Sequence, residues 1–296
     1  GMKPEVGRDS AVESYEEIKA TLKGADIIFI AAGLGGGTGT GAAAIIAKAA
    51  KEIGALTVSV VTKPFTWEGK KRAGLANLGL EELKKVSDSI IIVPNDRLLE
   101  IIDENVGMKD AFKIIDNILY QAVNGMSEVI LNPGNSDINT DFADVKTIMQ
   151  HKGMALMGIG RAKGENAAQR ALEDAIDSPL LDKVSLNGAK GILIHFNIHP
   201  QVSLFAINDV MGTINDRMDS NAEIIFGTTS DSTLEKDEVK ITIVATGFES
   251  KNDEVEEISE GNEENSNQNN NIVADSENYF DTPPLMRDYI VQYQLN

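Results

Sequence analysis

The sequence contains no cysteine, which excludes disulfide bonds, thiolate metal sites and thiol nucleophiles. It has only 3 histidines, too few to support a zinc-site hypothesis. Basic residues are also in the minority, with 27 Lys and Arg against 46 Asp and Glu, and the net charge of -19 disfavours nucleic acid as a partner. Thiol chemistry, zinc chemistry and direct attraction to a phosphate backbone are therefore the first function classes to be set aside.

Long apolar runs are missing as well. The longest, such as 27–32 and 90–93, fall far short of the ~20 residues that cross a bilayer. The first ten residues lack both the basic flank and the apolar stretch of a secretory signal. We therefore expect a cytoplasmic protein without direct membrane insertion. The 296 residues, 42% of them hydrophobic, suffice for about two domains.

Strands and helices alternate in the first part of the chain. Short β-branched runs at 25–32, 57–61 and 89–93 predict strands, and the helical spacing between them favours parallel pairing in an α/β sheet. Apolar residues then recur at helical spacing over 108–131, which predicts a helix of roughly 35 Å that connects two domains.

The later part of the chain predicts a separate α+β unit. Its last two strands, at 222–229 and 238–247, are consecutive around a polar turn, so at least one antiparallel pair is expected in a mixed sheet. Residues 249–278 then hold ten acidic residues against Lys251 alone and few apolar ones. This composition predicts a disordered linker, because so little apolar surface cannot offset the entropy of ordering.

The strongest local signal is a glycine-rich segment, Gly35 to Gly41, which has five glycines in seven residues and stands directly between a predicted strand and a predicted helix. Glycine lets backbone N–H groups approach an anion closely, and the amino terminus of a helix adds a favourable dipole. The segment is not a Walker loop, since no lysine follows its last glycine, and it does not fit the register of dinucleotide folds. It predicts a phosphate-binding loop.

The motif GGGTGTG after a short apolar strand resembles the FtsZ family of tubulin-like cell-division GTPases. The segments 62–65, 68–69, 94–99 and 141–145 carry the same resemblance, which runs from residue 1 to 248 and resumes near the carboxyl end. It implies a tubulin/FtsZ-like α/β fold with an incomplete Rossmann-type GTPase domain and a second α+β domain built on a mixed four-stranded sheet. The implied divisions are a truncated nucleotide-binding domain at 1–107, a central helix at 108–131, a second domain with the catalytic loop at 132–248, the linker at 249–278 and a partner-binding tail at 279–296.

The resemblance implies GTP or GDP as the ligand and a set of nucleotide-binding residues. These are Gly1, Gly35, Gly36, Gly37, Thr38, Gly39, Thr40, Gly41, Pro64, Glu68, Arg72, Asn95, Phe112 and Asp116. Within the set, Gly37, Thr38 and Gly39 are expected to hold the phosphates through backbone amides and the threonine hydroxyl. Gly1 is expected to lie close to them.

Other members of the set are assigned to the sugar and the base. Glu68 is expected to hydrogen-bond the ribose, and Arg72 to contact nucleotide oxygens or the base face. By the same resemblance Asn95 and Asp116 read the edge of guanine while Phe112 stacks on it. Phe112 and Asp116 are four residues apart, so they share one face of the predicted helix. Without the resemblance, Phe112 would be read as a core residue and Glu68 as an exposed charge.

The catalytic residues implied by the resemblance are Asn139, Asp141 and Asp144. Taken alone, Asp141 is a helix cap and Asp144 supports the first turn of the helix that starts at Phe142. By resemblance, this loop of one copy enters the nucleotide site of the next, where the two acids position water and Asn139 assists. Positioning the attacking water is a sufficient role for these residues, because phosphoryl transfer depends mainly on alignment and electrostatic stabilisation. Mg²⁺ is expected with the nucleotide, held mostly by phosphates and water.

A site formed by the nucleotide-binding residues of one copy and the catalytic loop of the next predicts a head-to-tail homopolymer, because this contact between copies does not close on itself. The resemblance extends this to filaments of a cytokinetic ring at the bacterial division septum. The tail residues Asp281, Pro283 and Arg287 match a family motif that binds membrane-tethering and regulatory division proteins such as the actin-like FtsA, and Leu285 is assigned to the same partner-binding tail. A disordered end with chance hydrophobicity is the alternative for this segment.

The sequence departs from the family at its start. By the resemblance, family chains carry about seventy further residues before the point that matches Gly1, and those residues supply the first sheet strands and another glycine-rich phosphate loop. With three strands left, the sheet is expected to keep an open edge. Two hypotheses follow: a shortened GTP-hydrolysing filament protein, or a nucleotide-incompetent fragment that acts only as an interaction module. Trp67, where the family usually has Phe, is a mild change.

Overall fold

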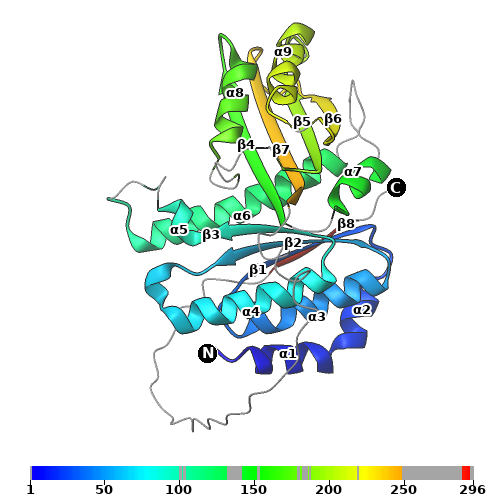
Figure 1. Ribbon diagram of the computed structural model, residues 1–296, viewed down its shortest axis with the longest axis vertical. Coiled ribbons are helices and arrows are strands. Elements are labelled where there is room, and N and C mark those ends of the chain that lie inside the picture. The colour runs from blue at the N-terminus through cyan, green and yellow to red at the C-terminus, as the bar shows by residue number, and fades with distance from the viewer. Residues whose placement is uncertain are drawn as a thin grey trace, which may run out of the picture.

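A computed structural model describes residues 2–99, 102, 105–131, 142–151, 154–178, 181, 186, 188–218, 220–248 and 289–293 (Figure 1). The elements up to residue 98 are α1 (Pro4–Glu13), α2 (Tyr15–Leu22), β1 (Ile27–Gly33), α3 (Thr38–Glu52), β2 (Leu56–Lys63), the 3₁₀ turn η1 (Thr66–Glu68), α4 (Lys70–Val86), β3 (Ser89–Pro94) and α5 (Asn95–Leu98). The later ones are α6 (Met108–Leu131), α7 (Phe142–Met149), β4 (Met154–Lys163), α8 (Ala167–Ile176), β5 (Gly191–Ile198), α9 (Leu204–Asn215), β6 (Glu223–Ser230), β7 (Glu238–Phe248) and β8 (Tyr289–Tyr293).

Strands β1, β2 and β3 are parallel neighbours, so the predicted α/β fold class is confirmed. Their sequences are almost continuously apolar because both faces of this sheet are covered. In β1, Ile27 and Phe29 pack toward α6, whereas Ile28 and Ile30 pack toward α3 and α4 on the other face. The alternation follows from the two-residue period of a strand.

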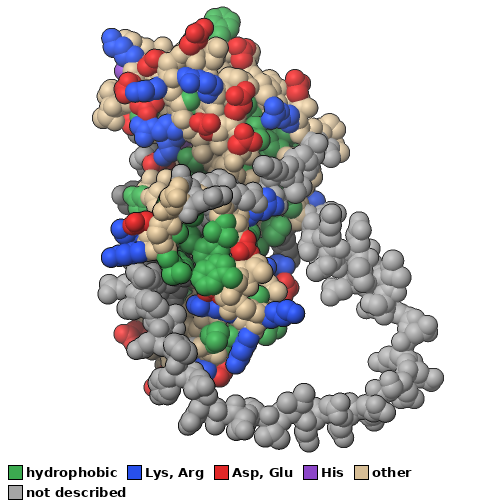
Figure 2. Space-filling model, turned by 90° about the vertical axis from the view of Figure 1, so that its left-hand side faces the viewer, with side chains coloured by type: hydrophobic (Ala, Val, Ile, Leu, Met, Phe, Trp, Pro, Cys, Tyr) green, Lys and Arg blue, Asp and Glu red, His purple; other side chains and the backbone are tan. Residues whose placement is uncertain are grey.

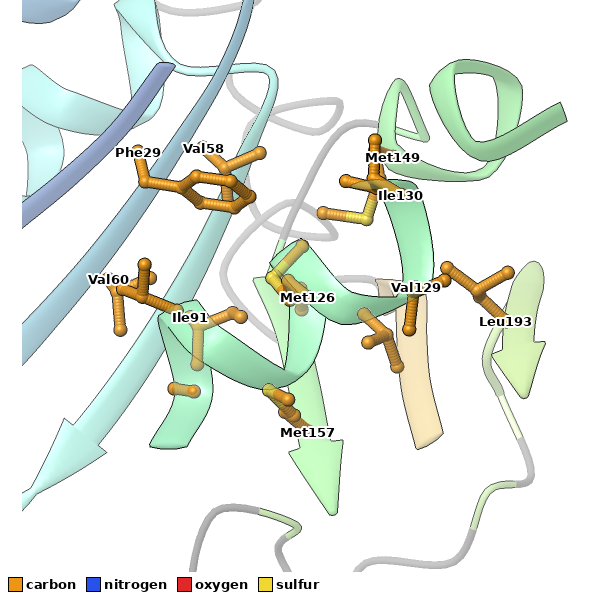
Figure 3. Packing of buried hydrophobic residues seen from close by; sticks show 14 of the residues in the cluster. Phe29, Val58, Val60, Ile91, Met126, Val129, Ile130, Met149, Met157 and Leu193 are labelled. Atoms are coloured by element: carbon orange, nitrogen blue, oxygen red, sulfur yellow. The ribbon is translucent and has the colours of Figure 1, made fainter. Parts of the chain in front are cut away.

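Helix α6 lies between the two halves of the molecule and contributes to a core that both halves share (Figures 1 and 3). Met126 and its neighbours on α6 face Phe29 and Val58 of the first strands, and the same cluster includes Met157 and Leu193 of the later strands. One helix therefore holds the two halves together through continuous apolar contact. None of the helices in the described parts of the chain combines the length and apolar character needed to cross a bilayer.

The later strands form a mixed arrangement with antiparallel pairs, as expected, although the two consecutive strands are not one of those pairs. Strands β6 and β7, consecutive in the chain, do not pair with each other, because β5 lies between them in the order β6-β5-β7-β4. The antiparallel pairs are β4 with β7 and β5 with β7, and β6 is parallel to β5. Helices α8 and α9 cover the outer face of this sheet (Figure 1).

The sheet is continuous through both halves, with the order β6-β5-β7-β4-β3-β2-β1-β8. Two residue pairs between β3 and β4 make the junction. At the other end, β8 runs antiparallel to β1. The expectation of an open sheet edge was therefore wrong, because residues 289–293 of the same chain occupy that edge. Before β1, the chain forms two helices, α1 and α2, which meet at Ser14.

Candidate functional site

The carboxyl ends of the three parallel strands bring most of the predicted site residues together. The glycine-rich segment follows β1, Pro64 follows β2, and Asn95 follows β3. In open α/β sheets this edge is where ligands bind, because the connecting loops and helix amino termini converge there. The sequence places small or polar residues at all three exits.

Gly35 fixes the shape of the turn after β1. Its φ is +99°, a left-handed value that favours glycine, and a Cβ there would lie 2.8 Å from Cγ of Arg72 and 3.3 Å from Cγ of Pro64. The Gly35 N–H donates a 2.8 Å hydrogen bond to Oγ1 of the buried Thr40. Thr40 and Gly35 were predicted as direct ligand contacts, but this hydroxyl and this amide bind each other and order the loop.

The first turn of α3 presents backbone donors toward the same edge. Gly37 is the N-cap residue and has no side chain to cap the helix. The first intrahelical hydrogen bond is donated by the Gly41 N–H to the Gly37 carbonyl oxygen at 3.0 Å. The amides of Thr38, Gly39 and Thr40 precede this bond and therefore have no acceptor within the helix. Thr38 is exposed. Unpaired amides and the helix dipole together make a site for an anion.

Helix α1 packs behind this turn through two glycines. A Cβ at Gly41 would lie 2.0 Å from the carbonyl oxygen of Pro4, and a Cβ at Gly7 would lie 2.5 Å from that of Gly37. Gly41 was predicted to touch the nucleotide. The contact with Pro4 gives it a packing role, since only glycine allows the two helices to approach so closely.

Glu68 and Arg72, both assigned to the nucleotide by resemblance, contact each other. The Arg72 guanidinium lies 2.7 Å from Oε2 of Glu68, and Oε1 of Glu68 accepts a hydrogen bond from the Phe65 N–H at 2.9 Å. The Glu68 side chain is only 11% exposed. The Nε of Arg72 is buried without a hydrogen-bond partner. The carboxylate thus orients a guanidinium that keeps donors for a ligand.

Aromatic side chains adjoin this pair. Phe65 packs edge-on against the half-buried Phe112, with ring centroids 6.1 Å apart, and stacks with Trp67 at 5.2 Å. Trp67 is 61% exposed. The residue at position 67, noted from sequence only as a mild family departure, is therefore an exposed aromatic beside the predicted base-stacking residue. Its exposed position could not be read from local pattern.

The loops after β2 and β3 are joined by Asp96, a residue that the sequence did not single out. Its carboxylate accepts from the Thr66 N–H at 3.0 Å and from the Thr66 hydroxyl at 2.6 Å. The neighbouring Asn95 is 2% exposed and its Oδ1 has no hydrogen-bond partner. A buried carbonyl oxygen of this kind lacks a donor that a ligand could supply.

Asp116 projects from α6 one turn beyond Phe112 and is exposed. Partial loss of hydration raises the pKa of its carboxyl. Figure 2 views the molecule from the side on which α5 lies and shows hydrophobic side chains gathered at mid-height, with lysine and arginine side chains nearby. Exposed hydrophobic residues at this edge include Trp67, Leu99 and Met108.

Asp144, the predicted catalytic residue that the structure describes, does not join this group within one copy. Asp144 is exposed in the first turn of α7. Figure 1 shows α7 beyond one end of α6 and α5 near the other end, and α6 has 24 residues, about 36 Å. Asn139 and Asp141, like Gly1 and the tail residues Asp281, Pro283, Leu285 and Arg287, lie outside the described residues.

Comparison with known proteins gives a consistent set of similarities. Residues 1–103 match a family model described as the Tubulin/FtsZ family, GTPase domain, and residues 153–249 match one described as the FtsZ family, C-terminal domain. An FtsZ dimer structure from M. jannaschii is 46% identical, with a TM-score of 0.76, and the match covers 83% of this chain and 71% of that chain. CetZ1 from Haloferax volcanii, at 18% identity and a TM-score of 0.69, covers 84% of this chain and 74% of its own, and shares the fold.

Proposed function

The chain belongs to the FtsZ family of tubulin-like GTPases, and we propose that it binds GTP at the carboxyl edge of β1–β3 and hydrolyses it between neighbouring copies. Family membership supports GTPase activity, GTP or GDP binding and a cytoskeletal role. The residue roles, the polymer and the cellular location go further and are developed here as the proposal.

One observation carries the phosphate site: the uncapped amides at the start of α3, directly after the glycine-rich turn. The amides of Thr38, Gly39 and Thr40 can donate to phosphate oxygens, and the exposed Thr38 hydroxyl can add a further hydrogen bond. Gly36 has open space where a Cβ would be, so a phosphate group can approach the backbone there. Arg72, oriented by Glu68, supplies positive charge nearby.

The base site follows from the residues beside it. Asn95 has a buried oxygen that can accept from a nucleobase donor, and the Asp116 carboxylate can accept from two adjacent guanine N–H groups. Phe112 is held edge-on by Phe65 and offers a ring face for stacking. Guanine is favoured over adenine because guanine presents two adjacent donors, N1–H and the N2 amino group, to one carboxylate, whereas adenine presents its amino donor beside the N1 acceptor.

Mg²⁺ is part of the proposal as a counter-ion of the triphosphate. In the portions of the chain that the structure describes, no three acidic or histidine side chains are grouped to hold a metal ion. The donor set fits a cation that is held mainly by phosphate oxygens and water, as Mg²⁺ commonly is. Neutralising phosphate charge is the chemistry that it would supply.

We place hydrolysis between copies because Asp144 and the glycine-rich turn belong to distant parts of one chain. In a head-to-tail contact, α7 of one copy would face the nucleotide of the next, where Asp141 and Asp144 would position water with help from Asn139. Such a contact repeats without closing and gives filaments. We further propose a role in the ring at the cytoplasmic side of the division septum, with the tail bound to membrane-tethering proteins such as FtsA.

The proposal is tested first by Asp144→Asn in a phosphate-release assay. At saturating GTP, turnover should fall by about 100-fold or more, because the group that aligns water is lost. GTP affinity, measured by equilibrium binding, should stay within about twofold. Asp174→Asn, an exposed acid on α8, is the matched control and should change neither quantity. Lost GTP binding in Asp144→Asn would contradict a role confined to hydrolysis.

A mixing experiment tests the shared site. Asp116→Ala should bind GTP weakly but keep Asp144, whereas Asp144→Asn keeps the nucleotide site. Mixed together, they should hydrolyse GTP faster than either alone, since each supplies what the other lacks. A mixture no faster than the sum of its parts argues against completion between copies. If the unaltered chain binds no GTP at all, the interaction-module hypothesis replaces the proposal.

A further inference from the structure

Strands β2 and β3 leave the sheet side by side at the edge where the nucleotide site is proposed. Their last residue pair is Lys63 opposite Pro94. Beyond this pair the chain continues into η1 after β2 and into α5 after β3. The ladder of backbone hydrogen bonds ends there, so other contacts decide how the two segments lie relative to each other.

Asp96, in the first turn of α5, makes such a contact with η1. Its Oδ1 and Oδ2 accept from the Thr66 N–H at 3.0 Å and 3.2 Å, and Oδ2 also accepts from the Thr66 hydroxyl at 2.6 Å. Hydrogen bonds to a charged acceptor are stronger than those between neutral groups. A carboxylate that binds both donors of one residue also fixes the orientation of that residue. Asp96 therefore anchors η1 to the segment after β3.

The anchored turn orients one group of predicted nucleotide contacts. Oε1 of Glu68 accepts from the Phe65 N–H at 2.9 Å, and Oε2 lies 2.7 Å from the Arg72 guanidinium. The Glu68 N–H donates to the Phe65 carbonyl at 3.0 Å and closes the turn. Thr66 lies between Phe65 and Glu68, so a bond to Thr66 restrains both of them.

The segment after β3 carries another predicted contact. Asn95, directly before Asp96, is 2% exposed, and its Oδ1 has no hydrogen-bond partner. Phe65, at the start of the anchored turn, packs edge-on against Phe112 with ring centroids 6.1 Å apart. The position of η1 relative to β3 therefore sets the spacing between the residues assigned to ribose and phosphates and those assigned to the base.

The middle of η1 has few other restraints. The buried Phe65 side chain fixes the start of the turn, but Thr66 and Trp67 are exposed, and η1 has 3 residues. The turn is followed by Gly69, which has a φ of +99° and open space at its Cβ position. A short exposed segment of this kind has low local stability. Loss of the Asp96 contact should therefore loosen η1 while β2 and β3 stay folded.

An equivalent contact lies at the opposite edge of the same two strands. Oδ2 of Asp88, just before β3, accepts from the Thr57 N–H of β2 at 2.9 Å, and the Asp88 N–H donates to the Thr57 carbonyl at 2.9 Å. At about 3.3 Å per residue, Thr57 lies roughly 20 Å from Lys63 at the other end of β2. Both aspartates join β2 to β3 through a threonine, but Asp88 does so away from the predicted nucleotide contacts.

We propose that Asp96 is a positioning residue of the nucleotide site: by anchoring Thr66, it holds η1 in register with the segment after β3. The inference rests on the proposed function, since it concerns the same site. Asp96 acts through Thr66 and does not itself contact the nucleotide. Its loss weakens nucleotide binding without unfolding the chain.

Equilibrium GTP binding by Asp96→Ala and Asp88→Ala tests the proposal, at a temperature well below the unfolding midpoint of each variant. Asp96→Ala should weaken GTP affinity by about tenfold, because the two groups of contacts are no longer preorganised in one geometry. Asp88→Ala loses a hydrogen bond of the same kind and should leave the affinity within about twofold of the unaltered chain. Unchanged affinity in Asp96→Ala, or an equal loss in both variants, would overturn the inference.

The threonine side of the contact gives a second test. Thr66→Val removes the hydroxyl and should weaken GTP affinity by about threefold, whereas Thr66→Ser keeps the hydroxyl and should stay within about twofold. In a double variant, Thr66→Val should add nothing to the loss caused by Asp96→Ala, because both changes act on the same contact. Additive losses would show that Asp96 does not act through Thr66 and would overturn the inference.

Amide hydrogen exchange at Thr66, measured without nucleotide, separates the anchor from the proposed function. Asp96→Ala should speed this exchange by about tenfold or more, because the acceptor is lost. Exchange at Leu34, which donates to the Thr62 carbonyl of β2, should stay within about threefold. Unchanged exchange at Thr66 would overturn the anchor whatever the nucleotide affinity. Faster exchange in a chain that binds no GTP even when unaltered would instead overturn the proposed function, and the positioning role with it.

Discussion

Two strand-to-helix junctions in this molecule use glycine in opposite ways. At β1–α3 the glycines lie in the turn and the first helical residues, and they leave the amides at the start of α3 open. At β4–α8 one glycine, Gly164, lies in the turn, but Gly158 and Gly160 lie in the strand, where Cβ atoms would be 2.1 Å and 1.9 Å from carbonyl oxygens of α8. The first arrangement exposes backbone donors, and the second brings a helix close to a sheet.

The surroundings reinforce the contrast. The start of α8 is preceded by Glu165, and the Arg170 side chain there donates to the Lys163 carbonyl within the same junction. Glu173 and Asp174 lie on the hollow beside it. Arg161, Lys163 and Arg170 line the same hollow, so its charge is mixed, and the Arg170 guanidinium is already bound within the junction. Glycine content alone therefore does not identify a phosphate site; open amides at the start of the helix do.

The largest expected effect is at the packing junction. Gly160→Ala places a methyl group on the Ala171 carbonyl, so β4 and α8 must separate, and we expect the free energy of unfolding to fall by about 3 kcal/mol. Chemical denaturation measures this change. Gly212→Ala, on the exposed side of α9 with open space at Cβ, is the control and should stabilise by about 0.5–1 kcal/mol. An unchanged midpoint for Gly160→Ala would show that the junction can relax.

Acid should weaken the second half of the molecule by a comparable amount. Burial lowers the pKa of His195 to about 4; the Glu128 carboxylate favours its charged form and Lys240 opposes it. The unfolded chain, with an ordinary histidine pKa near 6.5, takes up a proton first. Stability from this group is therefore complete above about pH 6.5 and falls by about 3 kcal/mol as pH drops to about 4.

The measurement is denaturant unfolding at several pH values, with His195→Asn for comparison. The variant keeps a polar group beside Oγ1 of Thr229, which lies 3.0 Å from the His195 ring nitrogen, but it cannot titrate. The difference in stability between the two proteins should shrink as pH falls from 6.5 toward 4. A constant difference over that range would show that His195 does not titrate as described.

The smallest effect on stability is expected at the β1–α3 turn. Substitutions at its two adjacent glycines, Gly35 and Gly36, should affect stability and GTP binding differently. In Gly35→Ala the added Cβ would lie 2.8 Å from Cγ of Arg72, and alanine would have to adopt a left-handed φ. The free energy of unfolding should therefore fall by about 1–3 kcal/mol. In Gly36→Ala the added Cβ would have no heavy atom within 4 Å, so the free energy of unfolding should change by no more than about 0.5 kcal/mol. The methyl group should nevertheless weaken GTP binding by about tenfold. Thermal unfolding and GTP titration distinguish the two. Unaltered GTP binding in Gly36→Ala would remove that backbone position from the site.

Much of the first half could be predicted from sequence. The runs at 25–32, 57–61 and 89–93 gave three parallel strands, and the helix at 108–131 has the same bounds as α6. The sequence did not reveal that Thr40 binds Gly35, that Glu68 pairs with Arg72, or that Asp96 joins two loops. These contacts depend on which side chains meet after the strands have aligned, and local pattern carries no information about that.

By itself the sequence determined the α/β class, the long central helix and the glycine-rich turn before a helix, because hydrophobic period and glycine content act over a few neighbouring residues. Only the tertiary structure decided that β5 separates β6 from β7 and that residues 289–293 cover β1. Strand pairing joins segments distant in the chain, and it is set by the competition among all available edges for backbone hydrogen bonds.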